Sequence, residues 1–560
     1  MPAYDLEATA TTPLLRRSST DSSARSKRVR RRHRPRRPGP PIYTYPAIFS
    51  LFLFALATIA AWDISVGKCK IPGLCRVLGG IQEPLEKVWM RNAGPYAPYM
   101  SRGHGGGAAG LPKGCKVDQV SIVSLVADGD IPLTYQLHRH TGRYPTQDAG
   151  DRTRLVLKKL ANRRIRNVRS EYSWLGTADF ELQDWDMGQL TKQGRRAAWD
   201  SGRTYAERYA SLFHHDGIFA RSSRQQRVVE TSEFWLQAFH GHPFDGPVRV
   251  PPNVVIAEGE DRNNTLSVHS CPRFNALSPP AGEKEKREIA RLLDPAVTRL
   301  NGIFQPNPPF DVDDIGRLAD LCGFDSQASG ESWKGWSHWC RLLRRDEWEV
   351  AGYVADVARW YRVGEGSRFG KIMGAGWVNE LLARLTDTAP VDQTTTNHTL
   401  DDDPATFPPG GKRIFVDFTH DNEMIEILTA MGIRKMRRKL PIRHLPDDER
   451  RFILSELIPF GARWAVERIE CDESDHDHQQ PVTVLAGEHP GADGDTSQNG
   501  TTTTSTYVRL LINDHPAHID HMACRSSAHY SHYLCELDAF IESQAWATDD
   551  VDWDDCRLRK

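Results

Sequence analysis

A run of 21 residues without a charged side chain, residues 42–62, divides the chain into two unequal parts. At about 1.5 Å per residue, a helix of this length spans the hydrocarbon core of a membrane. Nine of the thirteen residues from Arg25 to Arg37 are Lys or Arg, and positive charge before a span favours a cytoplasmic N-terminus. We therefore predict a disordered basic tail at 1–41, a transmembrane signal anchor at 42–62, and residues 63–560 outside the cytoplasm.

Two alternatives to this topology remain open. A cleaved signal peptide would release a secreted protein, although its charged segment is normally much shorter than 41 residues. The basic run is also typical of a nuclear signal or a nucleic-acid-binding patch. Residues 1–41 carry 11 Lys/Arg and three acids, so with an overall net charge of −1 the remaining residues sum to about −9. A body of that sign disfavours binding to nucleic-acid phosphates, and we expect no nucleic-acid partner.

Cysteines and glycosylation sequons support an extracytoplasmic body. All ten Cys follow the apolar run, and an even number in such a domain suggests disulfides. No C-x-x-C pair occurs, which argues against a structural zinc site, and we expect no metal. The three N-x-S/T sequons also follow the run; they begin at Asn263, Asn397 and Asn499.

The body alternates short apolar runs with amphipathic segments, which favours an α/β core. Buried strands are expected at residues 120–127, 134–137 and 414–418. Helices are expected at residues 191–209, 227–239, 284–293, 348–361 and 422–431. We predict a stalk or arm at 63–114, an α/β core made of 115–274 and 371–560, and an inserted, mostly helical cap at 275–370.

The densest polar cluster follows the predicted strand at 134–137. Arg139, His140 and Arg143 would form the cationic wall of a pocket for a tetrahedral dianion, because the Arg fork matches phosphate oxygens. A His in such a pocket can act as a nucleophile through an imidazole nitrogen. By itself, however, this short pattern is more typical of a solvated basic turn.

Two further groups of polar residues lie next to predicted helices. His420 and Asp421 lie between a strand and the start of a helix, where free N–H groups and the helix dipole favour anions. Simple N-capping by Asp421 or Asn422 is the alternative. Arg221 lies shortly before another predicted helix and is a further candidate anion ligand, or else part of a basic surface loop.

Taken together, these clusters resemble the histidine acid phosphatase family, in particular its fungal phytase branch. The residues Arg139-His140-Thr141-Gly142-Arg143-Tyr144-Pro145 resemble the family's R-H-G-x-R-x-P. The stretch from Arg221 to Val228 resembles R-[AST]-S-x-x-x-R-V, and the stretch from Asp417 to Asn422 resembles D-F-[ST]-H-D-N. The resemblance extends from about Pro95 to Cys556.

The resemblance implies a phosphoglycerate mutase-like fold, with a mixed, mainly parallel sheet flanked by helices. It implies an acid phosphatase that hydrolyses phosphate monoesters, with phytate among the candidate substrates, and that uses no cofactor. His140 would form a phosphohistidine, and Asp421 would protonate the leaving alcohol. The groups that would bind the phosphoryl oxygens are Arg139, Arg143, Arg221 and His420. A protonated Asp is abundant only at acid pH, which predicts an acid optimum.

The resemblance also implies a cysteine pairing that the residues alone cannot establish. The implied pairs are Cys69–Cys75, Cys115–Cys471, Cys271–Cys556, Cys322–Cys340 and Cys524–Cys535.

The chain departs from the family at several positions. Thr141 replaces the Gly that follows the nucleophile, which raises the alternative of a catalytically inactive, phosphatase-like binding protein. A paired Lys of phytases reads Ala358-Arg359, another basic position reads His214, and Lys334 is displaced by one. Fewer fixed cations predict a weaker preference for phytate than phytases have.

Overall fold

The computed structural model describes most of the predicted body. The described residues are 85–99, 111–112, 114–117, 134–164, 170–212, 217–260, 262–328, 336–408, 414–433, 438–446, 450–472, 504–549 and 551–558. All of them belong to one compact unit, residues 83–560.

Several predictions fall outside the described residues. They are the basic tail, the anchor at 42–62, the strand at 120–127, Cys69, Cys75, Asn499, His214 and Lys334. Within the described part of the chain, none of the helices combines the length and apolar character needed to cross a membrane.

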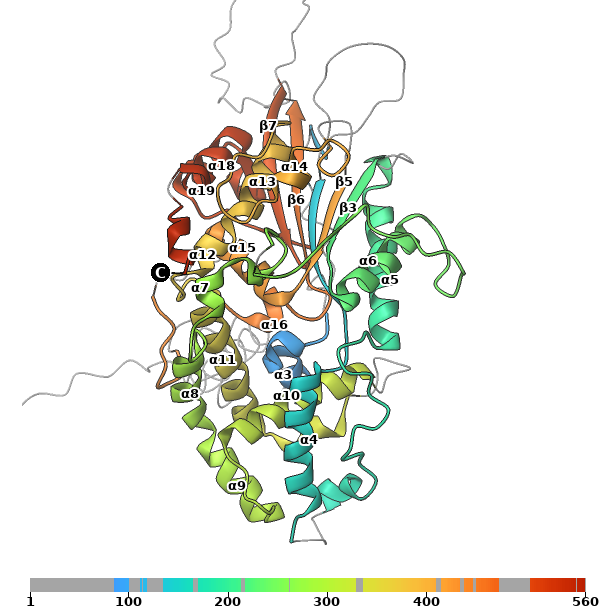
Figure 1. Cartoon of the computed structure of the whole chain (residues 1–560), viewed down its shortest axis with the longest axis vertical. Coiled ribbons are helices and arrows are strands. Elements are labelled where there is room, and N and C mark those ends of the chain that lie inside the picture. The colour runs from blue at the N-terminus through green and yellow to red at the C-terminus, as the bar shows by residue number, and fades with distance from the viewer. Residues whose placement is uncertain are drawn as a thin grey trace, which may run out of the picture. The chain divides into compact units, whose positions relative to one another are not determined.

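A nine-stranded mixed sheet forms the centre of the unit (Figure 1). Its main order is β4-β3-β5-β2-β6-β7-β8, and β1 and β9 pair with β6 and β7. The strands are β1 Cys115–Lys116, β2 Thr134–Arg139, β3 Ile218–Ser223, β4 Val254–Ile256, β5 Ile414–Thr419, β6 Arg463–Asp472, β7 Thr504–Ile512, β8 His515–Ala517 and β9 Leu534–Glu536. The four strands β4, β3, β5 and β2 are parallel, and the pairings beyond β2 are antiparallel. The predicted α/β class and mixed sheet are confirmed, with parallel pairing confined to these four strands.

Helices cover both faces of the parallel strands, as their continuous burial requires. On one face, Val416 and Phe418 of β5 pack with Tyr205 of α5 (Lys192–Arg208) and Trp235 of α6 (Gln226–Phe239). Phe415 alternates with them in the strand and so points to the other face. There it belongs to the core that includes residues of α13 (Ala375–Leu385) and α15 (Asp421–Ala430).

The segment predicted as a helical cap folds into four main helices. They are α8 Glu283–Ala290, α9 Asp294–Phe304, α10 Val312–Ala328 and α11 Arg345–Arg362. Helices from outside that segment contact them: among these, α3 (Leu85–Asn92) packs on α11, and α4 (Gln147–Ala161) packs on α10 (Figure 1). The helical layer therefore includes chain from the predicted arm and from the first core segment, and its boundary as a separate subdomain stays a prediction.

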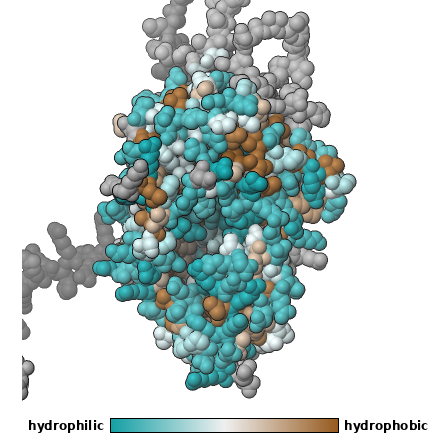
Figure 2. All heavy atoms as spheres, in the orientation of Figure 1, coloured by the Kyte–Doolittle hydropathy of each residue, from teal (hydrophilic) through white to brown (hydrophobic). Residues whose placement is uncertain are grey.

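Short helices complete the unit. They are α7 Pro272–Asn275, α12 Gly370–Met373, α14 His398–Asp401, α16 Leu454–Leu457, α17 Met522–Arg525, α18 Leu537–Gln544 and α19 Trp546–Asp549. Helix α12 packs on α15, and α18 packs on β7. The face seen in Figure 2 is mostly hydrophilic and is hollowed near its middle.

Four disulfides lie in the described part of the chain, and they are pairs that the resemblance implied. They are Cys115–Cys471, Cys271–Cys556, Cys322–Cys340 and Cys524–Cys535. The first joins β1 to β6 across a sequence separation of 356 residues.

Two of the predicted glycosylation sites are neighbours in the fold. The side-chain amide of Asn263 donates to the carbonyl of Thr396 at 3.1 Å, and that of Asn397 donates to the carbonyl of Asn263 at 3.3 Å. Glycosylation of these residues stays a prediction.

Disulfide removal tests how far the long cross-link stabilises the fold. Replacing both Cys115 and Cys471 by Ser should lower the unfolding free energy more than replacing Cys524 and Cys535, which are 11 residues apart. Loop-closure entropy predicts a difference of roughly 3 kcal/mol, because the longer loop restricts the unfolded chain more. Urea unfolding of the two double variants measures it, and equal losses would contradict the entropic account.

Candidate active site

The carboxyl ends of β2 and β5 bring two of the predicted clusters together. The strands are parallel and adjacent, with Arg139 opposite Thr419, so the residues that follow them meet at one edge of the sheet. The backbone N–H of His140 donates to the carbonyl of Thr419 at 3.1 Å. The rings of His140 and His420 lie 5.7 Å apart between centroids. We call this edge the His140 site.

His140 is held as a neutral imidazole with one unprotonated nitrogen. Its Nδ1 lies 3.0 Å from the carbonyl of Thr141, and because a carbonyl only accepts, Nδ1 carries the proton. Burial, followed by the charges of Arg227, Arg143 and Arg139, lowers the pKa of His140 well below its usual range. The lone pair therefore stays on Nε2, which Arg143 Nε approaches at 3.5 Å.

Arg139 is fixed before any ligand binds. Its Nη1 donates to the carbonyls of Pro95 and, at 2.6 Å, Ile458, and its guanidinium lies 4.7 Å from the ring centre of Phe460. Its Nη2 lies 3.5 Å from Asp421 Oδ2. Burial lowers the pKa of Arg139 to about 10, which still leaves it charged at neutral and acid pH. The side chain is a preorganised cation next to His140 and Asp421.

Close backbone contacts fix the loop that carries Arg143. The carbonyl of Gly142 accepts from the N–H of Thr191 at 3.0 Å. A Cβ at Gly194 would lie 1.9 Å from the same carbonyl oxygen, so α5 approaches this loop too closely for a side chain there. Arg143 Nη1 donates to the carbonyl of Tyr144 at 2.8 Å.

Thr141 fits this loop without the backbone conformation that would demand glycine. Its φ is outside the left-handed region. Its N–H donates to Thr231 Oγ1 at 3.3 Å, and its own Oγ1 lies 3.5 Å from the same atom. Thr141 is therefore accommodated beside His140 through its contacts with Thr231.

Arg221 lies elsewhere, and its placement contradicts the predicted role in phosphate binding. It is a residue of β3 and stands opposite Asp417 of β5. Its Nε and Nη2 donate to the two oxygens of Asp417 at 2.8 and 2.7 Å, and Nη2 also donates to Glu380 at 2.6 Å. All three side chains are buried. The guanidinium neutralises carboxylates between the sheet and α13, so it is committed to a buried ion cluster.

Arg227, six residues further along the same motif, supplies the cation at the His140 site. It lies in the first turn of α6, and its Nη2 lies 3.3 Å from Nδ1 of His420. Burial and the neighbouring charge of Arg143 lower its pKa to about 10. The sequence motif contains both arginines. They differ in their secondary structure: Arg221 lies within strand β3, whereas Arg227 lies in the first turn of helix α6.

His420 is oriented by Arg227 on one side and by Glu258 on the other. Its Nε2 lies 3.0 Å from Oε1 of Glu258. The pKa of His420 is lowered, and burial is the main cause. Burial alone would raise the pKa of Glu258, but hydrogen bonds from His420, Ser223 and Gln225 lower it to about 2. Glu258 was not identified from the sequence, because it follows the short strand β4 with no motif of its own.

Asp421 is surrounded by arginines. It begins α15, and its Oδ2 lies 3.5 Å from Arg139 Nη2 and 3.8 Å from Arg359 Nη2. Burial alone would raise the pKa of Asp421, but Arg139, Arg359 and Arg143 outweigh it and hold that pKa below its usual range. Like Glu258, Arg359 of α11 was not predicted as a residue of this site. The sequence analysis named it only at a position that binds phytate in phytases.

Comparison with known proteins identifies the family of the chain. A family model described as "Histidine phosphatase superfamily (branch 2)" matches residues 135–513. Phytase A of Arthroderma benhamiae is 28% identical over 476 residues, covering 83% of this chain and 91% of the relative.

Solved structures share the fold at lower identity. The phytase from D. castellii superposes with a TM-score of 0.60 at 19% identity, covering 85% of this chain and 91% of that one. A Bifidobacterium longum multiple inositol polyphosphate phosphatase, solved in complex with phosphate, gives a TM-score of 0.54 at 14% identity, covering 84% of this chain and all of that one.

Alanine variants of three arginines in one segment test the corrected assignment. Arg227→Ala should raise the Kd for inorganic phosphate at least about tenfold, because a charge-assisted hydrogen bond worth about 1.5–3 kcal/mol would be lost. Arg221→Ala should instead lower the melting temperature, because Asp417 and Glu380 would lose their buried partner. Calorimetric titration and thermal melts measure both effects.

Arg224→Ala is the matched control for this pair, because Arg224 belongs to the same segment and is exposed. It should change neither quantity. The assignment would be overturned if Arg221→Ala kept its melting temperature and lost phosphate binding while Arg227→Ala bound normally.

Proposed function

We propose that this chain, which belongs to branch 2 of the histidine phosphatase superfamily, hydrolyses phosphate monoesters through a phosphohistidine on His140. Membership of the family confirms the predicted enzyme class, a phosphomonoester hydrolase. The observation that carries the proposed mechanism is the unprotonated Nε2 of neutral His140, which accepts from Arg143 and lies among the guanidinium groups of Arg139, Arg143 and Arg227.

The charge of the site suits one phosphate dianion. Four guanidinium groups, those of Arg139, Arg143, Arg227 and Arg359, accompany two carboxylates, those of Asp421 and Glu258. Four positive and two negative charges leave about two positive charges, which a phosphate dianion would balance. Phosphoryl transfer depends mostly on positioning and on positive charge at the phosphoryl oxygens, and these groups supply both.

In the first step, Nε2 of His140 attacks phosphorus and forms the N–P bond while the bond from phosphorus to the ester oxygen breaks. Arg139, Arg143 and Arg227 would neutralise the phosphoryl oxygens throughout. His420 is proposed as a further ligand of these oxygens in its protonated form, in which Nδ1 donates to a phosphoryl oxygen while Nε2 stays bonded to Glu258. The proton on Nδ1 remains bonded to the carbonyl of Thr141, which stabilises the charged phosphoimidazole.

Asp421 would give its proton to the departing alcohol oxygen. In the unliganded site the surrounding arginines favour the ionised form of Asp421. The sequence had predicted a protonated Asp421 without this effect of the arginines. A bound phosphate dianion adds negative charge and offsets Arg139 and Arg143, so it raises the pKa of Asp421. Proton donation is thus linked to substrate binding as well as to an acid medium.

Water then attacks phosphorus and breaks the N–P bond. The Asp421 carboxylate takes a proton from that water, phosphate leaves, and His140 returns to its neutral form. The lowered pKa of His140 favours an unprotonated Nε2 in a more acid medium than an ordinary imidazole would tolerate, which suits an enzyme working in acid.

An inactive binding protein on the same scaffold was the alternative, and its main support was Thr141. The relaxed backbone of Thr141 and the arrangement of charged groups around His140 remove that support. Phytate is a candidate substrate by similarity to phytases. Arg359 keeps one of the two cations at the paired-Lys position, and Ala358 lacks the other.

We further propose that the enzyme acts outside the cytoplasm as a single-pass membrane protein, held by residues 42–62, with a cleaved, secreted form as the alternative. The four disulfides support an extracytoplasmic site, because such bonds persist in oxidising compartments. The charge-free run and the basic residues before it support the anchor.

His140→Ala should abolish turnover of p-nitrophenyl phosphate, because no other nucleophile would form the covalent intermediate. Acid quenching with a radiolabelled phosphomonoester should label the unmodified protein on His140 and leave the variant unlabelled. His444→Ala is the control, because His444 is exposed, and it should retain both turnover and label. A labelled His140→Ala protein would refute the assignment.

Asp421→Asn should reduce kcat for ethyl phosphate by about 10²–10⁴ and that for p-nitrophenyl phosphate much less, because the aryl alcohol departs without a proton. The control Asp538→Asn removes an acid from the first turn of α18, outside the site, and should alter neither rate. Equal losses on both substrates in Asp421→Asn would contradict proton donation.

A further inference from the structure

The main chain of Thr141 is hydrogen-bonded to the nucleophile on one side and to helix α6 on the other. Its carbonyl accepts from Nδ1 of His140 at 3.0 Å, and its N–H donates to Oγ1 of Thr231 at 3.3 Å. Residue 141 therefore connects the imidazole of His140 to a hydroxyl group of α6. The proposed mechanism uses only the first of these two contacts.

The hydroxyl of Thr231 acts as an acceptor toward Thr141. A hydroxyl has one proton to give, and Thr231 donates it to the carbonyl of Arg227 at 2.8 Å, four residues earlier in α6. Its lone pairs are left for the N–H of Thr141. The hydroxyl of Thr141, 3.5 Å from the same oxygen, is then the donor in that contact as well. Thr231 thus joins the first turn of α6 to the loop that carries His140.

Burial makes the contact between Thr141 and Thr231 costly to lose. Both residues are buried, and so is His140. A buried N–H without an acceptor is unfavourable, so without the hydroxyl of Thr231 the main chain at residue 141 would turn toward another acceptor. Because the N–H and the carbonyl belong to one residue, that turn would also move the carbonyl away from Nδ1 of His140.

The hydrogen bond from His140 to the carbonyl of Thr141 is strongest in the transition state. When Nε2 attacks phosphorus, positive charge develops on the imidazole, and Nδ1–H becomes a better donor. The carbonyl therefore stabilises the transition state more than it stabilises the neutral ring. A group that holds this carbonyl in place affects the rate of phosphoryl transfer more than the affinity for phosphate.

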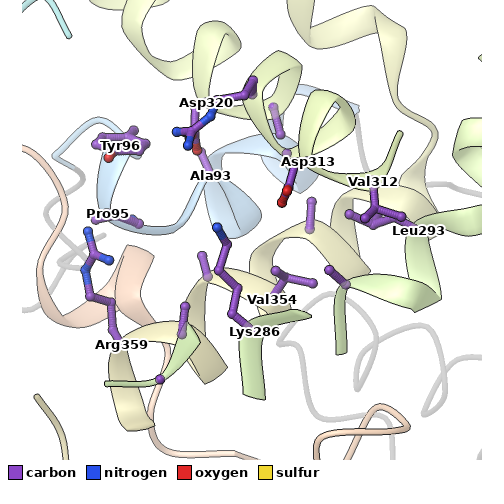
Figure 3. Close-up of a pocket in the computed structure, with 18 of the residues that line it drawn as sticks. Ala93, Pro95, Tyr96, Lys286, Leu293, Val312, Asp313, Asp320, Val354 and Arg359 are labelled. Atoms are coloured by element: carbon purple, nitrogen blue, oxygen red, sulfur yellow. The ribbon is translucent and has the colours of Figure 1, made fainter. Parts of the chain in front are cut away.

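Thr231 lies apart from the groups that would contact the alcohol of the substrate. The cavity beside the His140 site is lined by Pro95, Tyr96 and Arg359, which lie together in Figure 3. Thr231 does not belong to the residues that line this cavity. A change of Thr231 therefore leaves the cavity lining unaltered and isolates an effect on His140.

We propose that Thr231 is a positioning residue for the nucleophile. Through the main chain of Thr141, its hydroxyl holds the carbonyl that stabilises the positive charge of the phosphorylated His140. The proposal rests on the proposed function, because it concerns the same covalent step. It gives α6 a second part in that step besides Arg227.

Thr231→Val removes the hydroxyl and keeps a branched side chain. In rapid-quench, single-turnover experiments on the full-length protein with p-nitrophenyl phosphate, phosphorylation of His140 should slow at least about tenfold. The Kd for inorganic phosphate should change by less than about threefold, because the three arginines keep their places. Thr231→Ala removes the same hydroxyl without adding a methyl group in its place and should show the same pattern.

Thr231→Ser keeps the hydroxyl and should phosphorylate within about threefold of the unmodified protein. Thr153→Val is the matched control, because Thr153 is also a buried helical Thr whose hydroxyl donates to a carbonyl four residues earlier, that of Ala149 at 2.8 Å. It lies in α4 and should change neither the rate nor the Kd. Thermal melts of all four variants detect a defect in folding.

The possible outcomes separate this inference from the proposed function. Slowing by less than about tenfold in Thr231→Val and Thr231→Ala overturns the inference and leaves the phosphatase mechanism standing. A rise of more than about threefold in the Kd for phosphate also overturns it, since the hydroxyl would then act through Arg227. Failure of Thr231→Ser to restore the rate has the same meaning. An unmodified protein that forms no phosphohistidine overturns both.

Discussion

Repulsion among buried guanidinium groups is the constraint around which the site is built. Arg139, Arg143 and Arg227 converge on His140. Burial lowers the pKa of each, and a neighbouring guanidinium lowers it further: Arg143 acts on Arg139 and Arg227, and Arg359 acts on Arg143. Main-chain carbonyls hold Arg139 and Arg143 in place. Asp421 balances part of the charge. Burial, together with the remaining positive charge, keeps His140 neutral, and the same positive charge attracts a phosphate dianion.

A second, buried ion cluster, made of Arg221, Asp417 and Glu380, holds the strands that lead to the site. Arg221 links β3 to Asp417 of β5 and to Glu380 of α13, and the indole N–H of Trp377 donates to Asp417 at 3.1 Å. Removing one member would leave an uncompensated buried charge, which is costly. The cluster therefore fixes β3, from whose end the chain leads directly into Arg227 at the start of α6.

The sequence predicted those site residues that directly follow a buried strand. His140 and Asp421 are of this kind, because the ends of β2 and β5 are clear in the apolar pattern and parallel neighbours bring them together. Arg221 was chosen over Arg227 because a motif gives an order of residues and not the point at which a strand ends. Glu258, which follows β4, and Arg359, in α11, are brought to the site by tertiary packing. A local sequence pattern does not report such packing, so neither residue was predicted there. Thr141 looked disruptive because the sequence cannot report its backbone conformation.

The central claim is that phosphate is bound among Arg139, Arg143 and Arg227 with His140 as the nucleophile. A crystal structure of the protein with vanadate, which adopts the five-coordinate geometry of phosphoryl transfer, tests it most directly. The account predicts vanadium bonded to Nε2 of His140, with oxygens in contact with these three arginines. Vanadate bound at Arg221, or bound at the site without contact to His140, would contradict it.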